Sequence, residues 1–491
     1  MARREEPQRR KRQPKSQASK KFRNKEFAKM TYLFVTLFLA LISYIVYFNV
    51  FRAKTIVNSP YNVRQDAFAD RIIRGSITDR DGEVLAETQV GEGGTENRVY
   101  PYGAAFAHVV GYSNETAGKS GLESIENSEL LTSNAFFAEK FLNEFKDEKN
   151  HGDTVVTTLD AGLQQAAYNA LGENRGAIMV MEASTGKILA MVSGPSYDPN
   201  TIAQDWEALN ADSTYSPLLN RVTQGAYAPG STFKIVTALE YMREHPDYQN
   251  YSYNCEGSIT YEDITIRCFD STVHGLEDLR SSFANSCNSS FANIGLMLDR
   301  NSYRATAEEL LFNKKLPSVL DYSKSSFVVD ENTSDGEMMM TAMGQGNTLV
   351  SPYHMALITQ AIANGGTLME PYLVDKVTNY KGTEIRKNVP KSYKKLMTSE
   401  EASQLKDYMR AVVDEGTATM LSGQSYSVAG KTGTAEYSMT DGEKTHSWFV
   451  GFTNLDNPEL VISVIIEGYD GNAGAKAVPI AKQVLDSYYY Q

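Results

Sequence analysis

An uninterrupted apolar segment near the N-terminus constrains this chain more than any other feature of its sequence. Thr31–Val50 contains twenty residues and no formal charge. As an α-helix it spans about 30 Å, the thickness of the hydrocarbon core of a bilayer. The segment is apolar on all sides, unlike the amphipathic helix of a soluble core, and it lacks the cleavage site of a signal peptide. We therefore expect a permanent membrane anchor.

Charge is distributed unevenly about this anchor. Residues 1–30 contain twelve Lys or Arg and three Glu, whereas the whole chain has a formal net charge of −12. The basic residues before the anchor predict a cytosolic N-terminus, which places residues 51–491 outside the membrane. This large body is acidic and lacks the basic excess that nucleic-acid binding requires, so we expect no nucleic-acid partner.

Composition and turn residues divide the chain into four segments. Asp160 is a candidate N-cap before a helical pattern, and we place the main domain boundary there. The four expected segments are a basic, disordered cytosolic tail over 1–29, the transmembrane anchor over 30–50, a small and mostly β pedestal domain over 51–160, and a larger domain over 161–491.

Strand patterns occur at both ends of the larger domain, separated by a long and mainly helical region. A helix is expected to close the chain over Val478–Tyr488. The predicted strands are Ala177–Glu182, Ile188–Val192, Val428–Tyr437, Ser447–Thr453 and Leu460–Glu467, with a turn at Asp441-Gly442. We therefore expect an α+β fold in which a five-stranded antiparallel sheet is flanked by helices.

Ser231 is the candidate nucleophile, within Ala228-Pro-Gly-Ser-Thr-Phe-Lys234. Pro229-Gly230 predicts a turn and the following residues favour a helix, so Lys234 lies one turn after Ser231 on the same face. The amine can then reach the hydroxyl, and the helix dipole favours negative charge there. Ser-x-x-Lys also occurs at Ser184 and Ser392, so the spacing alone does not identify a site.

Two further polar motifs follow the candidate nucleophile. Ser286-Cys287-Asn288 lies in a stretch expected to be helical from Leu276 to Leu298. Lys431-Thr432-Gly433-Thr434 lies on a predicted strand, where glycine lets the backbone of a ligand approach closely.

The chain has three cysteines, Cys255, Cys268 and Cys287. The alternating segment Ser258–Arg267 predicts a hairpin that brings Cys255 and Cys268 together. Either these two form a bridge and Cys287 stays free, or all three are buried thiols. The spacing of the cysteines and histidines matches no common pattern of metal ligands, so we expect no metal.

The ordered set of three motifs resembles the active-site signature of penicillin-binding proteins and serine β-lactamases. Over residues 30–491 the chain resembles the class B (monofunctional) penicillin-binding proteins, of the penicillin-binding protein A or division-transpeptidase type. Further matching pieces are Arg74-Gly-Ser-Ile-Thr-Asp-Arg-Asp-Gly82, Ser120-Gly-Leu-Glu123, His274-Gly275, Gly344-Gln-Gly346 and Trp448-Phe-Val-Gly451.

The resemblance implies a peptidoglycan D,D-transpeptidase of the bacterial plasma membrane that needs no cofactor. Ser231 would attack the carbonyl of the penultimate D-alanine and release the terminal one, Lys234 would be its general base, and Ser286 would relay protons. The remaining motif residues would bind substrate: Asn288, Lys431, Thr432, Gly433 and Thr434. The backbone N–H groups of Ser231 and Thr434 would form the oxyanion hole.

The resemblance also implies partners: the stem peptides of lipid-linked nascent glycan, β-lactams that acylate the same serine, and a membrane glycosyltransferase of the shape/division polytopic family. Residues 51–160 are too few for a glycosyltransferase domain. A role in cell shape, division or sporulation stays open. One alternative is a serine β-lactamase, but the string Glu139–Asn143 that could supply its deacylating Glu precedes Ser231. The other is a non-enzymatic β-lactam sensor or scaffold, which the intact motifs disfavour.

Overall fold

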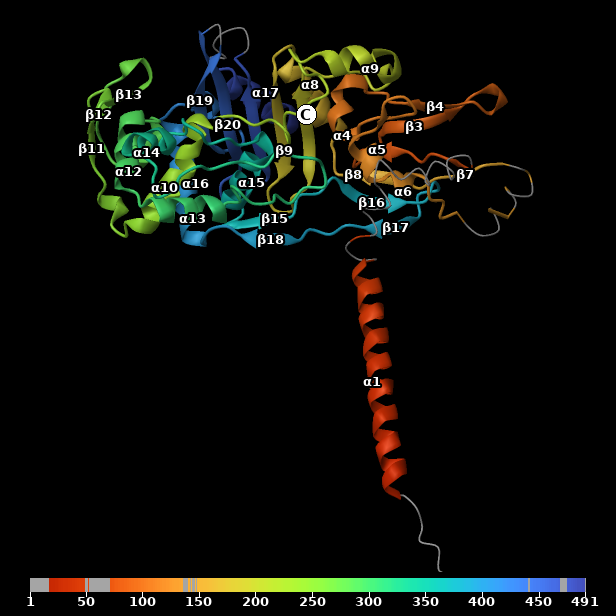
Figure 1. The fold of residues 1–491 in the computed structure, drawn as a ribbon. Helices are drawn as coiled ribbons and strands as arrows, with labels where there is room; N and C mark the ends of the chain where they lie inside the picture. The colour runs from red at the N-terminus through yellow and green to blue at the C-terminus, as the bar shows by residue number, and fades with distance from the viewer. Residues whose placement is uncertain are drawn as a thin grey trace, which may run out of the picture. The chain divides into compact units, whose positions relative to one another are not determined.

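The computed structural model describes residues 17–48, 52, 71–135, 140–141, 143, 146, 148–439, 442–468 and 475–490 (Figure 1). The chain divides into two compact units, Met1–Asn62 and Val63–Gln491. Expectations for residues 1–16, for Glu139 and for Asp441 in the predicted turn lie outside the described residues.

The first unit contains helix α1 (Gln17–Tyr47). Its segment Phe27–Tyr47 has a mean hydropathy of 2.0 and is long and apolar enough to cross a membrane. Large apolar side chains such as Leu37 and Phe38 are exposed along it, as lipid-facing residues are. The helix begins at Gln17, so the part of the basic tail that was expected to be disordered is helical from that residue onward.

The second unit begins with a six-stranded sheet. Its strand order is β17-β16-β8-β2-β3-β4, and the strands are β2 (Ile77–Thr78), β3 (Val84–Val90), β4 (Glu96–Val99), β8 (Thr154–Thr157), β16 (Val374–Thr378) and β17 (Glu384–Lys387). Val377 pairs with Val155 in antiparallel register. Two strands from residues 374–387 thus complete a sheet whose other strands precede residue 160.

A buried ion cluster stabilises this region. Glu123 is fully buried and accepts hydrogen bonds of 2.7 Å from Nε of Arg74 and Nε of Arg98. Burial alone would raise the pKa of Glu123, but the two guanidinium groups hold it below its ordinary value. The cluster gives a structural reason for the Arg74 and Glu123 motifs noted in the sequence.

The central element is a five-stranded antiparallel sheet with the order β10-β9-β21-β20-β19. Its strands are β9 (Gly176–Glu182), β10 (Ile188–Gly194), β19 (Val428–Met439), β20 (Gly442–Thr453) and β21 (Leu460–Ile466). The hairpin and the three later strands expected from the sequence are confirmed, and β19 lies at one edge.

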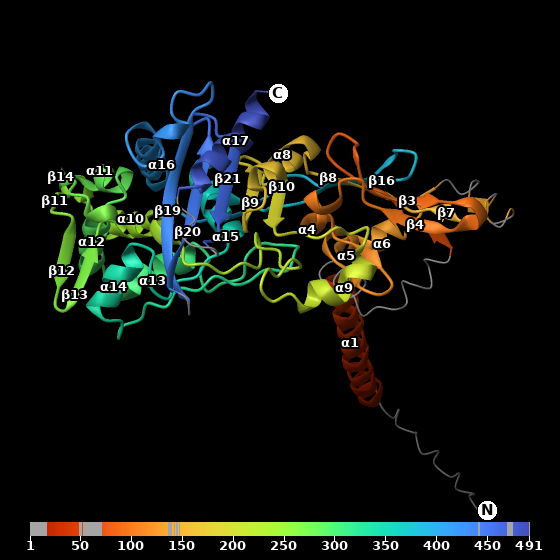
Figure 2. The ribbon, with the colours of Figure 1, turned by 90° about the horizontal axis from the view of Figure 1, so that it is seen from above.

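Helices cover both faces of this sheet, as Figure 2 shows. Helices α8 (Ala161–Leu171) and α17 (Ala477–Tyr489) pack on one face, and α15 (Pro352–Ala363), every residue of which is buried, packs on the other. Asp160 caps α8 by accepting a hydrogen bond from the N–H of Leu163. The expected α+β architecture is therefore confirmed.

Beyond the β19 edge lies a mainly helical region with α10 (Lys234–Glu244), α13 (Arg300–Glu309), α14 (Asp335–Ala342) and α16 (Ser399–Asp414). The expectation of one helix over Leu276–Leu298 is wrong. This stretch forms β14 (Gly275–Glu277), α11 (Leu279–Ala284) and α12 (Asn288–Met297). The break falls at Ser286, whose φ of 57° is left-handed and does not continue a helix.

Candidate active site

Ser231 and Lys234 lie where a tight turn becomes a helix. Residues Gly230–Phe233 form a 3₁₀-helix, η4, and α10 begins at Lys234. Three residues per turn place Ser231 and Lys234 on one face, as the sequence predicted, although through a 3₁₀ turn rather than an α-helical one. Ser231 is half-buried, whereas Lys234 has no exposed surface.

Two glycines allow the turn that holds Ser231. Gly230 has a φ of +53°, and its N–H donates to the carbonyl oxygen of Gly344 at 2.9 Å. A Cβ atom on Gly344 would lie 1.7 Å from the carbonyl oxygen of Gly230, and one on Gly230 would lie 2.5 Å from that of Thr434. The nucleophile turn is therefore packed directly against the backbone of β19.

Lys234 connects the first motif with the second. Its Nζ donates to the carbonyl oxygen of Ser286 at 2.7 Å, to Oδ1 of Asn288 at 2.8 Å and to Oγ of Ser286 at 3.3 Å. Among the described residues, Oγ of Ser231 has no hydrogen bond, so the hydroxyl is not committed to another group. Burial lowers the pKa of Lys234 to about 7, which makes its amine available as a base near neutral pH.

Lys431, on β19, contacts Ser286, the serine that also contacts Lys234. It is also fully buried, and its Nζ donates to Oγ of Ser286 at 2.9 Å. Burial and the charge of Lys234 hold the pKa of Lys431 well below its ordinary value. Oγ of Ser286 thus lies within hydrogen-bond distance of Nζ of Lys234 and Nζ of Lys431, and the protonated forms of both amines are disfavoured. This arrangement is suited to proton transfer through the Ser286 hydroxyl.

The third motif presents alternating side chains at the open edge of the sheet. Lys431 and Gly433 are buried, Thr432 is half-buried and Thr434 is exposed. Oγ1 of Thr432 lies 2.5 Å from Oγ1 of Thr417. Because β19 is an edge strand, an extended peptide can pair with its free side while hydroxyl groups contact the peptide. The structure thus joins Lys234, Ser286, Asn288 and Lys431 by hydrogen bonds and seats the Ser231 turn against Thr434.

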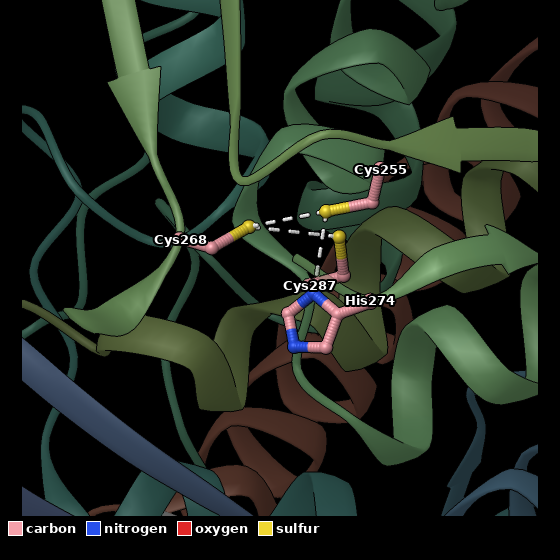
Figure 3. Close-up of side chains that lie close together, drawn as sticks. All are labelled: Cys255, Cys268, His274 and Cys287. Carbon is pink, nitrogen blue, oxygen red and sulfur yellow. Dashed lines mark hydrogen bonds between the residues drawn. The ribbon is translucent and has the colours of Figure 1, made fainter. Parts of the chain in front are cut away.

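One cluster near this site was missed by the sequence analysis. The ligand atoms of four side chains lie within 4.8 Å of one another: Cys255, Cys268, His274 and Cys287 (Figure 3). The hairpin of β12 (Ser258–Tyr261) and β13 (Ile264–Arg267) is confirmed and brings Cys255 near Cys268, but all three cysteines are free thiols. The cluster includes His274, which common metal-ligand spacings do not anticipate. Two signals in the sequence pointed toward the cluster: the hairpin predicted to bring Cys255 near Cys268, and a third cysteine inside the second motif.

Comparison with known proteins agrees with this geometry. Residues 176–486 match the family model of the penicillin binding protein transpeptidase domain, and residues 74–155 match the penicillin binding protein A dimerisation domain. The chain is 31% identical over 440 residues to peptidoglycan D,D-transpeptidase PbpA of Mycolicibacterium smegmatis, covering 84% of this chain and 88% of that protein. It is 30% identical to the PbpA protein of Mycobacterium tuberculosis, with the same coverage.

Solved structures show the same fold. The ceftriaxone acyl-enzyme complex of penicillin-binding protein A from M. tuberculosis has a TM-score of 0.77 and 28% identity, covering 86% of this chain and 99% of that one. The D,D-transpeptidase domain of a peptidoglycan glycosyltransferase from Eggerthella lenta has a TM-score of 0.76 and 31% identity, with the same coverage. The chain belongs to the penicillin-binding protein transpeptidase family.

Proposed function

We propose that this single-pass membrane protein is a peptidoglycan D,D-transpeptidase that works through Ser231. The observation on which the proposal rests is the buried Lys234, with a pKa near 7, one 3₁₀ turn from the Ser231 hydroxyl. In the reaction, an ester forms between a serine and the penultimate D-alanine of a stem peptide, and the terminal D-alanine leaves. An amine of a second stem peptide then attacks the ester and restores the serine. A β-lactam acylates the same hydroxyl.

In the acylation step, Lys234 takes the proton of Ser231 as Oγ attacks the carbonyl carbon. The lost proton must reach the nitrogen of the departing D-alanine. Ser286 Oγ contacts Lys234 Nζ at 3.3 Å, so it can pass a proton from Lys234 to the leaving amine. The N–H groups of Ser231 and Thr434 would donate to the developing oxyanion, which the contact between Gly230 and Thr434 supports.

The other motif residues bind the substrate in this proposal. The terminal carboxylate of the stem peptide is an anion, and its approach would favour the protonated form of Lys431. The hydroxyls of Thr432 and Thr434 would donate to the same carboxylate, and Gly433 would let the peptide lie close to β19. Asn288, held by Lys234, would hydrogen-bond the backbone of the stem peptide.

The charge distribution of the sequence supports a proposal for the cellular arrangement of the chain. The basic residues before the anchor support a cytosolic N-terminus and an extracytoplasmic catalytic body. We propose the segments 1–29, 30–50, 51–160 and 161–491 as tail, anchor, pedestal and transpeptidase domain. We also propose a polytopic membrane glycosyltransferase of the shape/division family as the partner that supplies the lipid-linked glycan.

The test is labelling of the full-length protein in detergent with a fluorescent penicillin, alongside mass spectrometry of a D-Ala-D-Ala stem peptide incubated with an acceptor amine. Ser231→Ala should abolish both the adduct and the cross-linked product while leaving the melting temperature close to that of the parent. Ser392→Ala, which changes the exposed serine of another Ser-x-x-Lys sequence, is the matched control. An adduct that survives Ser231→Ala would refute the assignment, and an adduct released rapidly would indicate a β-lactamase.

A further inference from the structure

Four potential metal ligands converge next to the second motif, each from a different element. Cys255 ends β11 (Tyr253–Cys255), Cys268 directly follows β13, His274 directly precedes β14, and Cys287 precedes α12. The three cysteines are buried and His274 is half-buried. Figure 3 shows the three sulfur atoms and the imidazole pointing toward one another.

Three distances between ligand atoms of the cluster are close to those of tetrahedral metal coordination. With Zn–S bonds of about 2.3 Å and Zn–N bonds of about 2.0 Å, two sulfurs at tetrahedral angles lie ~3.8 Å apart and a sulfur and a nitrogen ~3.5 Å apart. Sγ of Cys268 lies 3.7 Å from Sγ of both Cys255 and Cys287, and Sγ of Cys255 lies 3.3 Å from Nδ1 of His274. A disulfide would require about 2.05 Å between two sulfurs.

The surroundings favour negatively charged sulfur. The backbone N–H of Gly257 donates to Sγ of Cys255 at 3.4 Å, and that of Ser290 donates to Sγ of Cys287 at 3.4 Å. Cys287 is the N-cap of α12, so its sulfur lies at the positive end of a ten-residue helix. Oγ of Ser289 lies 3.2–3.4 Å from all three sulfurs. Hydrogen bonds of this kind stabilise metal-bound thiolates.

We propose that Cys255, Cys268, His274 and Cys287 form a closed Zn²⁺ site in this protein. A set of three thiolates and one imidazole selects a borderline-soft cation with tetrahedral preference, which is Zn²⁺ among the common divalent ions. Binding releases the three thiol protons to solvent. With four protein ligands the site has no open position, so its role is structural.

This site positions the second motif. Cys287 lies between Ser286 and Asn288, and Asn288 is held from both sides: Oδ1 accepts from Lys234, and Nδ2 donates at 3.0 Å to the carbonyl oxygen of Arg267, the residue before Cys268. Zn²⁺ bonds to Cys268 and Cys287 therefore fix both the turn that bears Ser286 and the carbonyl that orients Asn288. The four ligands are positioning residues for the proposed acylation, which is the one respect in which this inference rests on the proposed function.

The first experiment measures the metal without reference to activity. Full-length protein purified in detergent without chelators should contain about one zinc per chain by elemental mass spectrometry. The cobalt-substituted protein should show sulfur-to-cobalt charge-transfer bands and the intense visible bands of tetrahedral Co²⁺. A disulfide found by non-reducing peptide mapping, or three free thiols without metal, would overturn the proposal.

The second experiment uses matched histidine variants. His274→Gln removes one ligand and should lose most of the zinc, whereas His151→Gln changes an exposed histidine outside the cluster and should keep it. His274→Cys retains four ligands and should retain zinc, which distinguishes ligation from local packing. If His274→Gln does not fold, loss of zinc from the parent to a chelator, with recovery on adding Zn²⁺, provides the same comparison.

The third measurement is acylation by a fluorescent penicillin. Loss of zinc in His274→Gln should lower the acylation rate constant by at least about tenfold, and His274→Cys should restore most of it. If the protein with zinc and the protein without zinc are acylated at the same rate, the positioning role is refuted. Failure of the parent itself to be acylated would instead count against the proposed function, so the two failures are distinguishable.

Discussion

The Nζ atom of Lys431 donates a 2.9 Å hydrogen bond to Oγ of Ser286. This contact joins the edge strand to a serine that has a left-handed backbone, with φ of 57°. Non-glycine residues in that region cost roughly 1–2 kcal/mol, so the fold maintains strain at the position where a hydroxyl lies between two amines.

That geometry allows the hydroxyl and the strain to be tested separately. Ser286→Gly removes the hydroxyl and relieves the strain, so it should melt at or above the parental temperature while acylation falls by about 10²–10⁴-fold. Ser286→Ala should lose the same activity without the gain in stability. Penicillin labelling rates and thermal melting of both variants check this. A glycine variant that keeps most of its acylation rate would exclude a proton relay through Ser286.

Lys234→Arg tests the general base. Arginine keeps the positive charge but cannot give up its proton, so acylation should fall at least about a hundredfold. Lys406→Arg, at a half-buried lysine of α16 that belongs to none of the three motifs, should acylate like the parent. Melting curves show whether the larger side chain disturbs the fold. A loss of less than about tenfold in a folded variant would mean that Lys234 supplies charge rather than accepting a proton.

The acylation rate should depend on pH through Lys234. Only the neutral amine can accept a proton, and its pKa is about 7, so the rate should rise with pH up to about 7 and then level off. The lowered pKa of Lys234 also makes the stability of the protein depend on pH. Between about pH 7 and the ordinary lysine pKa of 10.5, the unfolded chain binds more protons than the folded one. Lys234 therefore increases the free energy of unfolding as the pH rises through this range. A pH-independent acylation rate between about pH 5.5 and 8.5 would contradict the assignment.

Gly344→Ala should damage the nucleophile turn more than a glycine change usually does. Its Cβ would lie 1.7 Å from the carbonyl oxygen of Gly230, at a φ of +87°. Gly346 has a similar φ of +83° but open space, with its nearest contact at 3.6 Å. Gly346→Ala should therefore cost about 1 kcal/mol, and Gly344→Ala more than about 3 kcal/mol together with reduced acylation. Equal denaturation midpoints for the two variants would show that the backbone contact is not tight.

Glu123→Gln should strongly destabilise the protein. It leaves the guanidinium groups of Arg74 and Arg98 buried without their anion, which costs about 3–5 kcal/mol. Glu309→Gln, at a mostly exposed partner of Arg243, should cost less than about 1 kcal/mol. The folded pKa of Glu123 lies below 4.5, so its stabilisation is present above that pH and is lost as the pH falls through the lower value. Urea melts of both variants at neutral and acidic pH provide the comparison.

The sequence predicted the central sheet well because its strands have strong local signals. Ile188–Val192 is a continuous apolar run, and Leu460–Ile466 is apolar except for Ser463. The prediction of one helix over Leu276–Leu298 failed because the backbone conformation of a single residue breaks that helix. Ser286 adopts a left-handed backbone that serine rarely takes, so a helical pattern across it looked continuous.

The four-residue cluster could not be predicted for a different reason. Its ligands come from two strand ends, a loop and a helix N-cap, and only tertiary folding brings these elements together. The hairpin that brings Cys255 near Cys268 was predicted, because alternation and a tight turn are local features. The convergence of Cys287 and His274 on that pair depends on how α12 packs, which no local pattern records.

Because Val377 pairs with Val155, the six-stranded sheet can be completed only late in synthesis of the chain. Strand β8 is synthesised about 220 residues before the strand that must lie beside it, and pairings so distant in sequence form slowly. The unpaired edge of β8 is therefore open to aggregation while residues 158–373 are still being synthesised. Once β16 has been made, it pairs with β8 and completes the six-stranded sheet, so damage to this later segment of the chain also weakens a sheet built mainly from residues before 160.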